Sequence, residues 1–342
     1  MIRNVLVTGG SGRLGSFVCP YLKSLGYNVA STDIAPAKRG TPNDVARIPF
    51  IKADLLKSSD LAKALAFSQA DAVVHLGAIP YRSEIQKPFE DNSWRGYASE
   101  GRTYTWTGNP EDYTMLNNTM GTYYVLDTCR RFDVKYFVSA SSFFVYGMGA
   151  RLSGNDYVPD EIPITEESKC EPEDTYSLSK LLNEETMQAF SRAYDMRCVA
   201  LRLLGVYYYN YAMSNRTHVL GRDYVIPKSE REAVMTGTIY EYADARDIAR
   251  FIGLVFDKFD TLPHKFEAFN VWTDTHFKPD SADFYTKLYP KLADKVKVLK
   301  GHEGIFSIEK ARKLLGYEPA YSWRNEPDKY PIKWDGTEKF DY

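Results

Sequence analysis

Short runs of β-branched and apolar residues alternate with longer helical patterns from the beginning of the sequence. The runs that we predict as strands cover residues 4–8, 28–32, 48–52, 72–76, 136–140, 198–203 and 266–272. Several of them are continuous apolar runs, which is typical of strands that helices cover on both faces. Because strands and helices alternate along the chain, the sequence predicts an α/β fold with a doubly wound parallel sheet.

The composition fits an ordinary globular protein and argues against several classes of function. Of the 342 residues, 44% are hydrophobic and 26% are charged, and the formal net charge is -2. This near-neutral charge gives no basic surface for nucleic acid, and the longest apolar stretches fall far short of the roughly 20 residues of a membrane helix. Without a secretion signal at the N-terminus, we expect a cytoplasmic protein with neither a nucleic-acid nor a membrane partner.

Cysteine and histidine show no spacing that indicates a metal site. Cys19, Cys129, Cys170 and Cys198 are far apart, so neither a disulfide framework nor a zinc site is expected. The histidines have no metal-ligand spacing, and no metal is predicted. His75 falls inside a predicted buried strand, where we expect a hydrogen-bonded core residue.

A glycine-rich sequence follows the first predicted strand. It reads Thr8-Gly9-Gly10-Ser11-Gly12-Arg13-Leu14-Gly15, and a helical pattern begins at once. Gly9, Gly12 and Gly15 have the spacing of a loop whose glycines allow a tight turn and a close approach to a pyrophosphate. The helix N-terminus offers free N–H groups to the anion. The sequence therefore predicts a Rossmann fold whose glycine loop binds a dinucleotide.

Acidic residues follow the next two predicted strands. Asp33 ends the second strand, where a carboxylate accepts hydrogen bonds from adenosine ribose hydroxyls and repels a 2′-phosphate. NAD is therefore favoured over NADP, while Arg13, Lys38 and Arg39 are nearby cations that either soften this preference or are solvated surface charges. Asp54 follows the third strand and either accepts from the adenine amine or caps a helix.

Two segments interrupt the alternation of strands and helices. Residues 79–115 are rich in Gly, Asn, Pro and aromatics, and they form either a lid or subunit contact or a surface excursion that buries its own aromatics. Residues 205–237 begin a smaller lobe. We predict a dinucleotide-binding domain at 1–204 plus about 238–272, and a C-terminal substrate-binding lobe at about 205–237 plus 273–342.

A tyrosine, a lysine and a serine suggest acid–base chemistry. Tyr176 and Lys180 open a helical pattern four residues apart, which puts both side chains on one face. A free phenol titrates near ~10, and a neighbouring ammonium brings its pKa toward neutrality. The fifth strand ends in Ser141 and Ser142, at the edge of the sheet where open α/β folds bind ligands. A serine there can reach a substrate oxygen beside the tyrosine.

Together these motifs resemble those of the extended short-chain dehydrogenases/reductases, also called the NAD-dependent epimerase/dehydratase family. The similarity covers most of the chain and includes His75-Leu76-Gly77-Ala78, Asn118-Thr119-Met120-Gly121-Thr122, Val145-Tyr146-Gly147, Arg246-Asp247-Ile248-Ala249 and Ala311-Arg312-Lys313-Leu314-Leu315-Gly316-Tyr317. The resemblance implies NAD as the cofactor, a carbohydrate-like small-molecule substrate, and a homodimer through a bundle that includes the Tyr176 helix.

The resemblance also implies roles for individual residues. Tyr176 is the general acid/base, Lys180 lowers its pKa and holds the nicotinamide ribose, and Ser142, or Ser141 if the alignment shifts by one residue, binds the reacting oxygen. The residues implied to bind the cofactor are Gly9, Gly12, Arg13, Leu14, Gly15, Asp33, Asp54, Leu55, Leu76, Gly77, Ala78, Asn118, Ala140, Tyr176 and Lys180. Those implied to bind the substrate are Ser83, Ser142, Phe143, Tyr146 and Gly205.

The sequence departs from the family pattern where members acting on nucleotide sugars bind a diphosphate. Those members usually carry Asn-Val-Tyr-Gly-Pro after the sixth strand and an arginine before the late Asp-Val-Ala run. Here the first motif reads Gly205-Val206-Tyr207-Tyr208-Tyr209, and Tyr240 stands at the arginine position. A diphosphate without charged donors loses its charge-assisted hydrogen bonds. Arg216, Arg222 and Lys228 could replace the missing positive charge at a diphosphate. The alternative is that they are solvated surface charges.

We therefore expect an NAD-dependent dehydrogenase that oxidises a free sugar, a sugar acid or a related alcohol. A sugar or nucleotide-sugar epimerase or dehydratase with retained cofactor is the alternative, because the same Tyr/Lys pair serves both reactions. A regulatory protein that senses the dinucleotide without catalysis is disfavoured by the presence of Tyr176 and Lys180.

Overall fold

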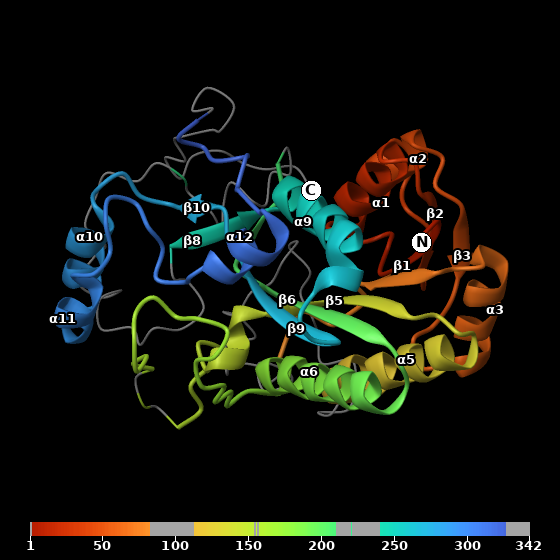
Figure 1. Cartoon of the computed structure of the whole chain (residues 1–342), viewed down its shortest axis with the longest axis horizontal. Coiled ribbons are helices and arrows are strands. Elements are labelled where there is room, and N and C mark those ends of the chain that lie inside the picture. The colour runs from red at the N-terminus through yellow and green to blue at the C-terminus, as the bar shows by residue number, and fades with distance from the viewer. Residues whose placement is uncertain are drawn as a thin grey trace, which may run out of the picture.

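The centre of the computed structural model, which describes residues 2–82, 113–153, 155, 157–209, 220 and 240–325, is a parallel sheet of seven strands. Their order is β3–β2–β1–β4–β5–β6–β9 (Figure 1). The strands are β1 (Asn4–Thr8), β2 (Asn28–Asp33), β3 (Phe50–Lys52), β4 (Ala72–His75), β5 (Tyr136–Ser142), β6 (Arg197–Leu203) and β9 (Phe266–Val271). The strand order reverses between β1 and β4. The predicted doubly wound sheet is confirmed, with each of the seven predicted strands in place.

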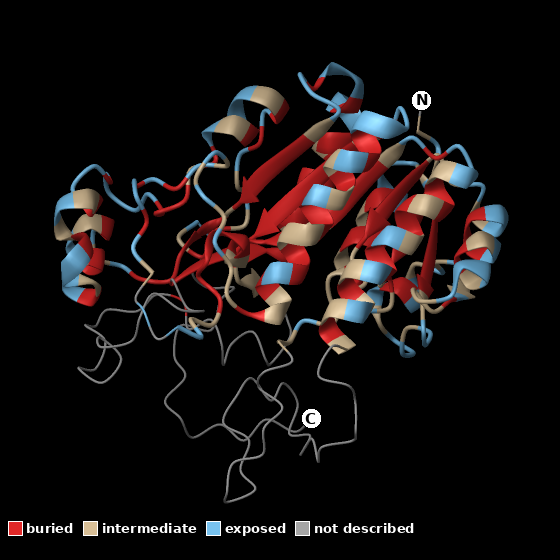
Figure 2. Cartoon of the chain, turned by 90° about the horizontal axis from the view of Figure 1, so that it is seen from below, coloured by how far each residue is buried: buried red, intermediate tan, exposed pale blue. Residues whose placement is uncertain are grey.

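Helices cover both faces of the sheet because the side chains of each strand alternate between two cores. Val5 and Val7 of β1 belong to a core with α1 (Gly15–Ser24) and α9 (Ala245–Lys258). Leu6 points the other way, into a core with α3 (Ser58–Ser68), α5 (Gly121–Arg131) and α6 (Thr175–Ala193). Figure 2 shows the buried strands between helices whose outer faces are exposed.

Shorter elements connect these layers. They are α2 (Pro42–Val45), α4 (Tyr113–Met115), the π-helix η2 (Leu116–Met120), the 3-10 helices η3 (Phe143–Tyr146), η4 (Phe259–Thr261) and η5 (Pro290–Leu292), and α12 (Glu309–Leu315). A π-helical turn inside a helix is uncommon and is frequent at functional sites. Here η2 lies between α4 and α5 and carries Asn118, one of the predicted cofactor residues.

A second, smaller unit lies beyond the carboxyl ends of β5 and β6. Its sheet has the order β10–β8–β7, with β7 (Val206–Tyr207), β8 (Glu241–Asp244) and β10 (Asp274–Thr275). Next to it lie α10 (Ser281–Leu288) and α11 (Ala293–Val296). Phe277 and Phe284 stack at 3.7 Å between ring centroids in its apolar core. This unit lies where the substrate-binding lobe is expected, and the domain boundaries stay a prediction.

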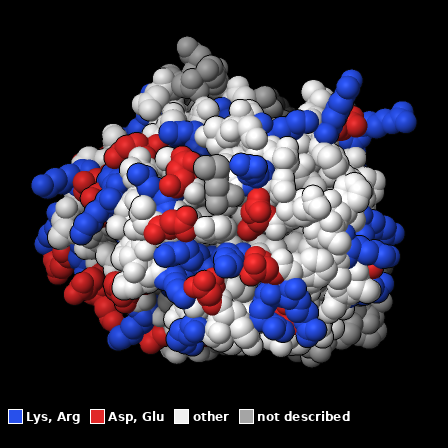
Figure 3. Space-filling view, turned by 45° about the vertical axis from the view of Figure 1, so that its right-hand side comes forward, with Lys and Arg blue, Asp and Glu red and all other residues white. Residues whose placement is uncertain are grey.

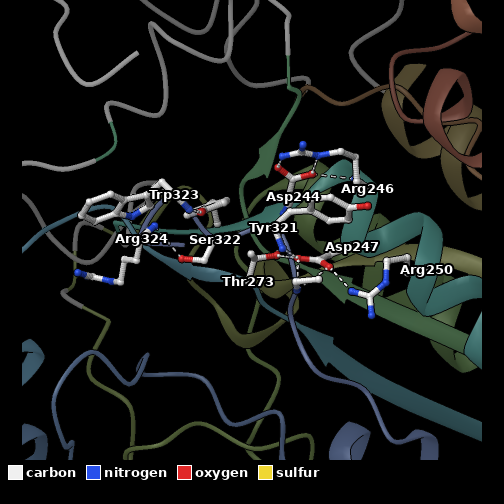
Figure 4. A network of polar contacts seen from close by, with 11 residues as sticks. Asp244, Arg246, Asp247, Arg250, Thr273, Tyr321, Ser322, Trp323 and Arg324 are labelled. Atoms are coloured by element: carbon white, nitrogen blue, oxygen red, sulfur yellow. Dashed lines mark hydrogen bonds and ion pairs between the residues drawn. The ribbon is translucent and has the colours of Figure 1, made fainter. Parts of the chain in front are cut away.

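The segment before residue 325 is bound to the N-terminal end of α9 by side chains (Figure 4). Buried Asp247 accepts the backbone N–H groups of Ala320 and Tyr321 at 3.0 and 3.1 Å, and it also pairs with Arg250 at 2.7 Å. Arg246 pairs with Asp244 at 2.8 Å. These contacts join the last described residues to α9 and to the smaller sheet.

The surface charges and the cysteines of the described residues do not indicate a particular function. Among the described residues, no helix is both long and apolar enough to cross a membrane, and no group of three or more potential metal ligands occurs. On the face shown in Figure 3, acidic and basic side chains are interspersed. All four cysteines are free thiols, and Cys19, Cys129 and Cys198 are buried.

Candidate active site

The glycine loop lies at the point where the strand order reverses, between β1 and β4. Gly9 has φ +66°, and a Cβ there would lie 2.5 Å from the backbone nitrogen of Gly77. A Cβ on Gly15 would lie 2.4 Å from the carbonyl oxygen of Gly10. Neither contact tolerates a side chain, since both partners are backbone. The loop closes with Gly12 N–H donating to the Gly9 carbonyl at 3.0 Å, and α1 then begins after Leu14.

This loop fits the pyrophosphate of a dinucleotide. A Cβ on Gly12 would meet only the Gly9 oxygen within 4 Å, at 3.1 Å, so the loop presents bare backbone on its outer side. The first turn of α1 adds a positive dipole end. Arg13 lies in the loop two residues before α1 begins, with its guanidinium 5.9 Å from the ring of Tyr208.

The predicted adenosine side is formed at the ends of β2 and β3. The Asp33 carboxylate accepts the Ile34 N–H at 2.8 Å, and burial raises its pKa above the usual range of an aspartate. Leu55 packs between the end of β4 and the start of α5, because a Cβ on Gly77 or Gly121 would lie 3.0 or 3.2 Å from it. These positions agree with the predicted cofactor roles, which stay a prediction.

Asp54 does not cap the following helix, which was its alternative interpretation, because the N-cap position of α3 is Lys57 and has no side-chain cap hydrogen bond. The Oδ1 of Asp54 accepts the Leu56 N–H at 3.0 Å, and its Oδ2 lies 3.7 Å from the Lys57 ammonium. The side chain is 38% exposed, so a contact to a ligand is sterically open as well.

His75 is a core residue, as expected. Its Nδ1 lies 2.6 Å from the Thr8 hydroxyl and its Nε2 lies 3.0 Å from the Thr122 hydroxyl. Burial, together with the charge of Lys180, lowers the pKa of His75 to about 3. The imidazole is therefore neutral, and it connects β1, β4 and α5.

Tyr176 lies in the first turn of α6. Asp174 caps this helix by accepting the Ser177 N–H at 2.9 Å. Burial raises the pKa of the Tyr176 phenol above its ordinary value, while a hydrogen bond with Ser142 lowers it and the Tyr208 phenol raises it. The phenol therefore lies beside the serine that was predicted for the reacting oxygen.

Lys180 follows Tyr176 on the same helix face. Its ammonium lies 5.7 Å from the centroid of the Tyr176 ring and donates to the Ala140 carbonyl at 2.8 Å. Burial lowers the pKa of Lys180 to about 8, against the charge of Glu184, which raises it. The structure thus brings together the predicted tyrosine, lysine and serine at the end of β5.

The two serines at the end of β5 face opposite ways, because neighbouring strand residues alternate. Ser141 donates to Glu184 at 2.5 Å inside the protein. Ser142 contacts Tyr176 and also accepts the Phe144 N–H at 3.2 Å. This geometry favours Ser142 over Ser141 for the contact with a substrate.

Asn118 binds the backbone that leaves β4. Its side-chain oxygen accepts the Ile79 N–H at 2.7 Å, and its nitrogen donates to the Ile79 carbonyl at 3.0 Å and to Ser179 at 3.1 Å. Asn118 therefore joins η2, α6 and the segment that carries Leu76, Gly77 and Ala78.

The predicted substrate residues lie in different surroundings. Phe143 is buried beside Phe306, and Tyr146 is fully buried with its hydroxyl bound to Asn270 at 2.7 Å. The Gly205 carbonyl accepts the Ala243 N–H at 3.0 Å. Ser83 lies outside the described residues. Only Ser142 of this set has a described contact with Tyr176.

Most of the 79–115 segment also lies outside the described residues, so its role stays open. Its two described ends meet, since Thr114 donates to the Tyr81 carbonyl at 2.8 Å.

Tyr208 was not among the predicted site residues. Its ring lies 6.3 Å from that of Phe17 and 5.9 Å from the Arg13 guanidinium, and its phenol raises the pKa of Tyr176. Tyr208 therefore lies between α1 and the start of α6. The signal in the sequence was the run of three tyrosines at 207–209.

The family model that matches this chain is the NAD dependent epimerase/dehydratase family, over residues 5–93 and 97–271. The chain therefore belongs to that family, and its cofactor is NAD. The Rossmann sheet and the glycine loop fit this assignment.

Individual relatives are distant but cover nearly the whole chain. An uncharacterized protein of Methanocaldococcus jannaschii is 25% identical, over 93% of this chain and 91% of its own length. The UDP-glucose 4-epimerase of Streptococcus mutans is 27% identical, over 93% and 92%. Among solved structures, the UDP-glucose 4-epimerase of Thermotoga maritima with UDP-glucose has a TM-score of 0.63 at 19% identity, covering 96% of this chain and 97% of that one.

Proposed function

We propose that this protein is an NAD-dependent dehydrogenase that oxidises a hydroxyl group of a free sugar, a sugar acid or a related alcohol. Tyr176 takes the hydroxyl proton, Ser142 holds the same oxygen by a hydrogen bond, and Lys180 keeps a positive charge beside the phenol. NAD, when bound, accepts the hydride. These three side chains come from the end of one strand and from one turn of a helix. Because both elements are rigid, they hold the substrate oxygen in line for proton transfer.

The observation that carries the choice of substrate is Tyr240. At the position of the family arginine, this residue is only 7% exposed and lies in the apolar core of the smaller unit, 5.5 Å from the ring of Phe284. Its carbonyl accepts the His276 N–H at 2.7 Å. A buried aromatic ring supplies no charged donor to a diphosphate, which supports a substrate without a nucleotide.

An epimerase acting on a nucleotide sugar is the second candidate. The names of relatives such as the Streptococcus mutans enzyme favour it. The same Tyr176, Lys180 and Ser142 serve both reactions, so the difference lies in whether the reduced cofactor leaves or returns the hydride.

One experiment separates the two candidates. The protein is incubated with NAD and a panel of free sugars, sugar acids and UDP-sugars, and both absorbance at the reduced-nicotinamide band and the stereochemistry of the product are followed. Net growth of reduced cofactor with a free sugar or sugar acid supports the proposal. An inverted UDP-sugar with no net change in cofactor would replace it by the epimerase. The Tyr176→Phe variant is the control for turnover at this site.

We also propose that the protein is a homodimer through α5 and α6. These helices pack side by side (Figure 1) and carry large apolar side chains that are exposed in the single chain. They are Tyr123, Leu178 and Tyr194, with Leu116 and Met120 on the adjoining η2. Light scattering with Tyr123→Glu and with Val298→Glu, an exposed apolar residue elsewhere, tests this: only the first substitution should give a monomer.

A further inference from the structure

A buried ion pair joins α6 to β6 beneath the catalytic residues. Arg202 Nη2 donates to Glu184 Oε2 at 2.8 Å, and Arg202 Nε lies 3.2 and 3.3 Å from the two carboxylate oxygens. Glu184 is 2% exposed and Arg202 is 6% exposed. Removing two ions from water is costly, and apolar residues in such places are often no less stable. The position of the pair therefore calls for an explanation beyond packing.

The carboxylate of Glu184 is connected to the same stretch of β5 as Lys180. Glu184 follows Lys180 by one helical turn, so both side chains lie on one face of α6. Ser141 donates to Glu184 at 2.5 Å, while the carbonyl of the preceding residue, Ala140, accepts the Lys180 ammonium at 2.8 Å. The anion and the cation are thus bound to consecutive residues of the strand that ends in Ser142.

Arg202 is held from its other side by the core. Its Nη1 donates to the Tyr146 hydroxyl and to the Glu166 carbonyl, each at 2.9 Å. Tyr146 in turn donates to Asn270 of β9 at 2.7 Å. Because these two groups fix Arg202, Arg202 in turn fixes the carboxylate of Glu184 in one place. Tyr146 was predicted to bind the substrate, but its described hydrogen bonds hold Arg202 and Asn270 in place.

Few charged groups face Lys180 among the described residues. His75 from β4 is neutral, the Tyr176 ring lies beside it on α6, and Glu184 supplies a negative charge. Burial lowers the pKa of Lys180 to about 8, and Glu184 opposes this. A neutral lysine would give no charge to favour the phenolate of Tyr176.

We propose that Glu184 is a positioning residue for catalysis: held by Arg202 and Ser141, it keeps Lys180 as an ammonium ion beside Tyr176. The inference rests on the roles of Tyr176 and Lys180 in the proposed function. Glu184 does not touch the substrate. It acts through Lys180, and its effect is therefore electrostatic.

The test is a titration of Lys180 that needs no substrate. The full-length protein, with and without NAD, carries lysine labelled with ¹³C at Cε, and the Lys180 signal is assigned by its loss in Lys180→Arg. Glu184→Gln should lower the midpoint of this titration by about one pH unit, since an opposite charge nearby has that order of effect. The alkaline limb of the turnover profile should move in the same direction.

Two further variants separate charge from structure. The double variant Glu184→Gln, Arg202→Met removes both charges, leaves no unpaired buried ion and is the safer variant to fold; its midpoint should also fall. Ser141→Ala keeps both charges and also the contacts by which Arg202 holds Glu184, so it should leave the midpoint unchanged. An unchanged midpoint in either folded Glu184 variant would overturn the proposal. A lowered midpoint in a protein that oxidises no sugar would leave it standing and refute only the proposed function.

Discussion

The cofactor half of the molecule, meaning the seven-stranded sheet with its glycine loop, and the smaller unit are held together by different kinds of contact. In the cofactor half, backbone lies against backbone: Gly9 against Gly77 and Gly15 against Gly10. Where the smaller unit and the last described residues meet α9, side chains make the contacts, and the Arg246 guanidinium lies 4.1 Å from the rings of both Tyr209 and Tyr321. A contact between backbones restricts which residue type can stand at each position. A contact between side chains instead depends on partners that are far away in the chain.

Among the residues that we propose for catalysis, removing the phenol of Tyr176 should have the largest effect. Tyr176→Phe keeps the ring and its 6.2 Å edge contact with Phe144 but loses the acid/base group. We expect turnover to fall by about 10²- to 10⁴-fold, the usual contribution of a positioned acid/base group. Absorbance of reduced cofactor measures turnover, and calorimetry should find NAD affinity unchanged. Substantial remaining turnover would remove Tyr176 from its role.

The backbone contacts of the cofactor half can be tested with two matched glycines. Gly9 and Gly316 have φ of +66° and +69°, but a Cβ on Gly316 would meet nothing within 4 Å. Gly316→Ala should therefore cost only the strain of the left-handed conformation, about 1–2 kcal/mol. Gly9→Ala should add about 1–3 kcal/mol of overpacking and abolish NAD binding. Urea unfolding and NAD titration measure both. Equal losses in the two variants would mean that the close approach at Gly9 is unimportant.

The side-chain contacts between α9 and the last described residues can be tested at Asp247. Asp247→Ala leaves the N–H groups of Ala320 and Tyr321, and the guanidinium of Arg250, without their partner. We expect a loss of about 1–3 kcal/mol in the free energy of unfolding, with NAD affinity unchanged. The control is Asp257→Ala, an exposed acid on the same helix that should change stability by less than ~0.5 kcal/mol. A clear loss of NAD affinity in Asp247→Ala would show that the two halves are not independent.

The same contrast explains how far the sequence could be interpreted. The strands, the glycine loop and the Tyr176–Lys180 face follow from local rules, since each depends on spacing within one turn or one element. The sequence analysis did not find Glu184, although Glu184 also lies one helical turn from Lys180. Its role becomes visible only in the structure, where Ser141 of β5 and Arg202 of β6 bind its carboxylate. For Tyr240, the sequence showed the absence of an arginine, but its burial beside Phe284 needed the structure.

Asp33 is the acidic side chain that we propose to favour NAD over NADP, and its removal should have the smallest effect of the four. Asp33→Asn should weaken discrimination against NADP by about tenfold, or ~1.4 kcal/mol, because the repulsion of a 2′-phosphate is lost. Burial raises the pKa of Asp33 above the usual range. In the unsubstituted protein the carboxylate is therefore protonated at a higher pH than an ordinary aspartate, and discrimination should weaken as the pH falls through that raised pKa. In Asp33→Asn this pH dependence should vanish. Fluorescence titrations with NADH and NADPH between pH 4.5 and 8 measure both effects, and a preference for NAD that persists in the variant would assign the selection to other residues.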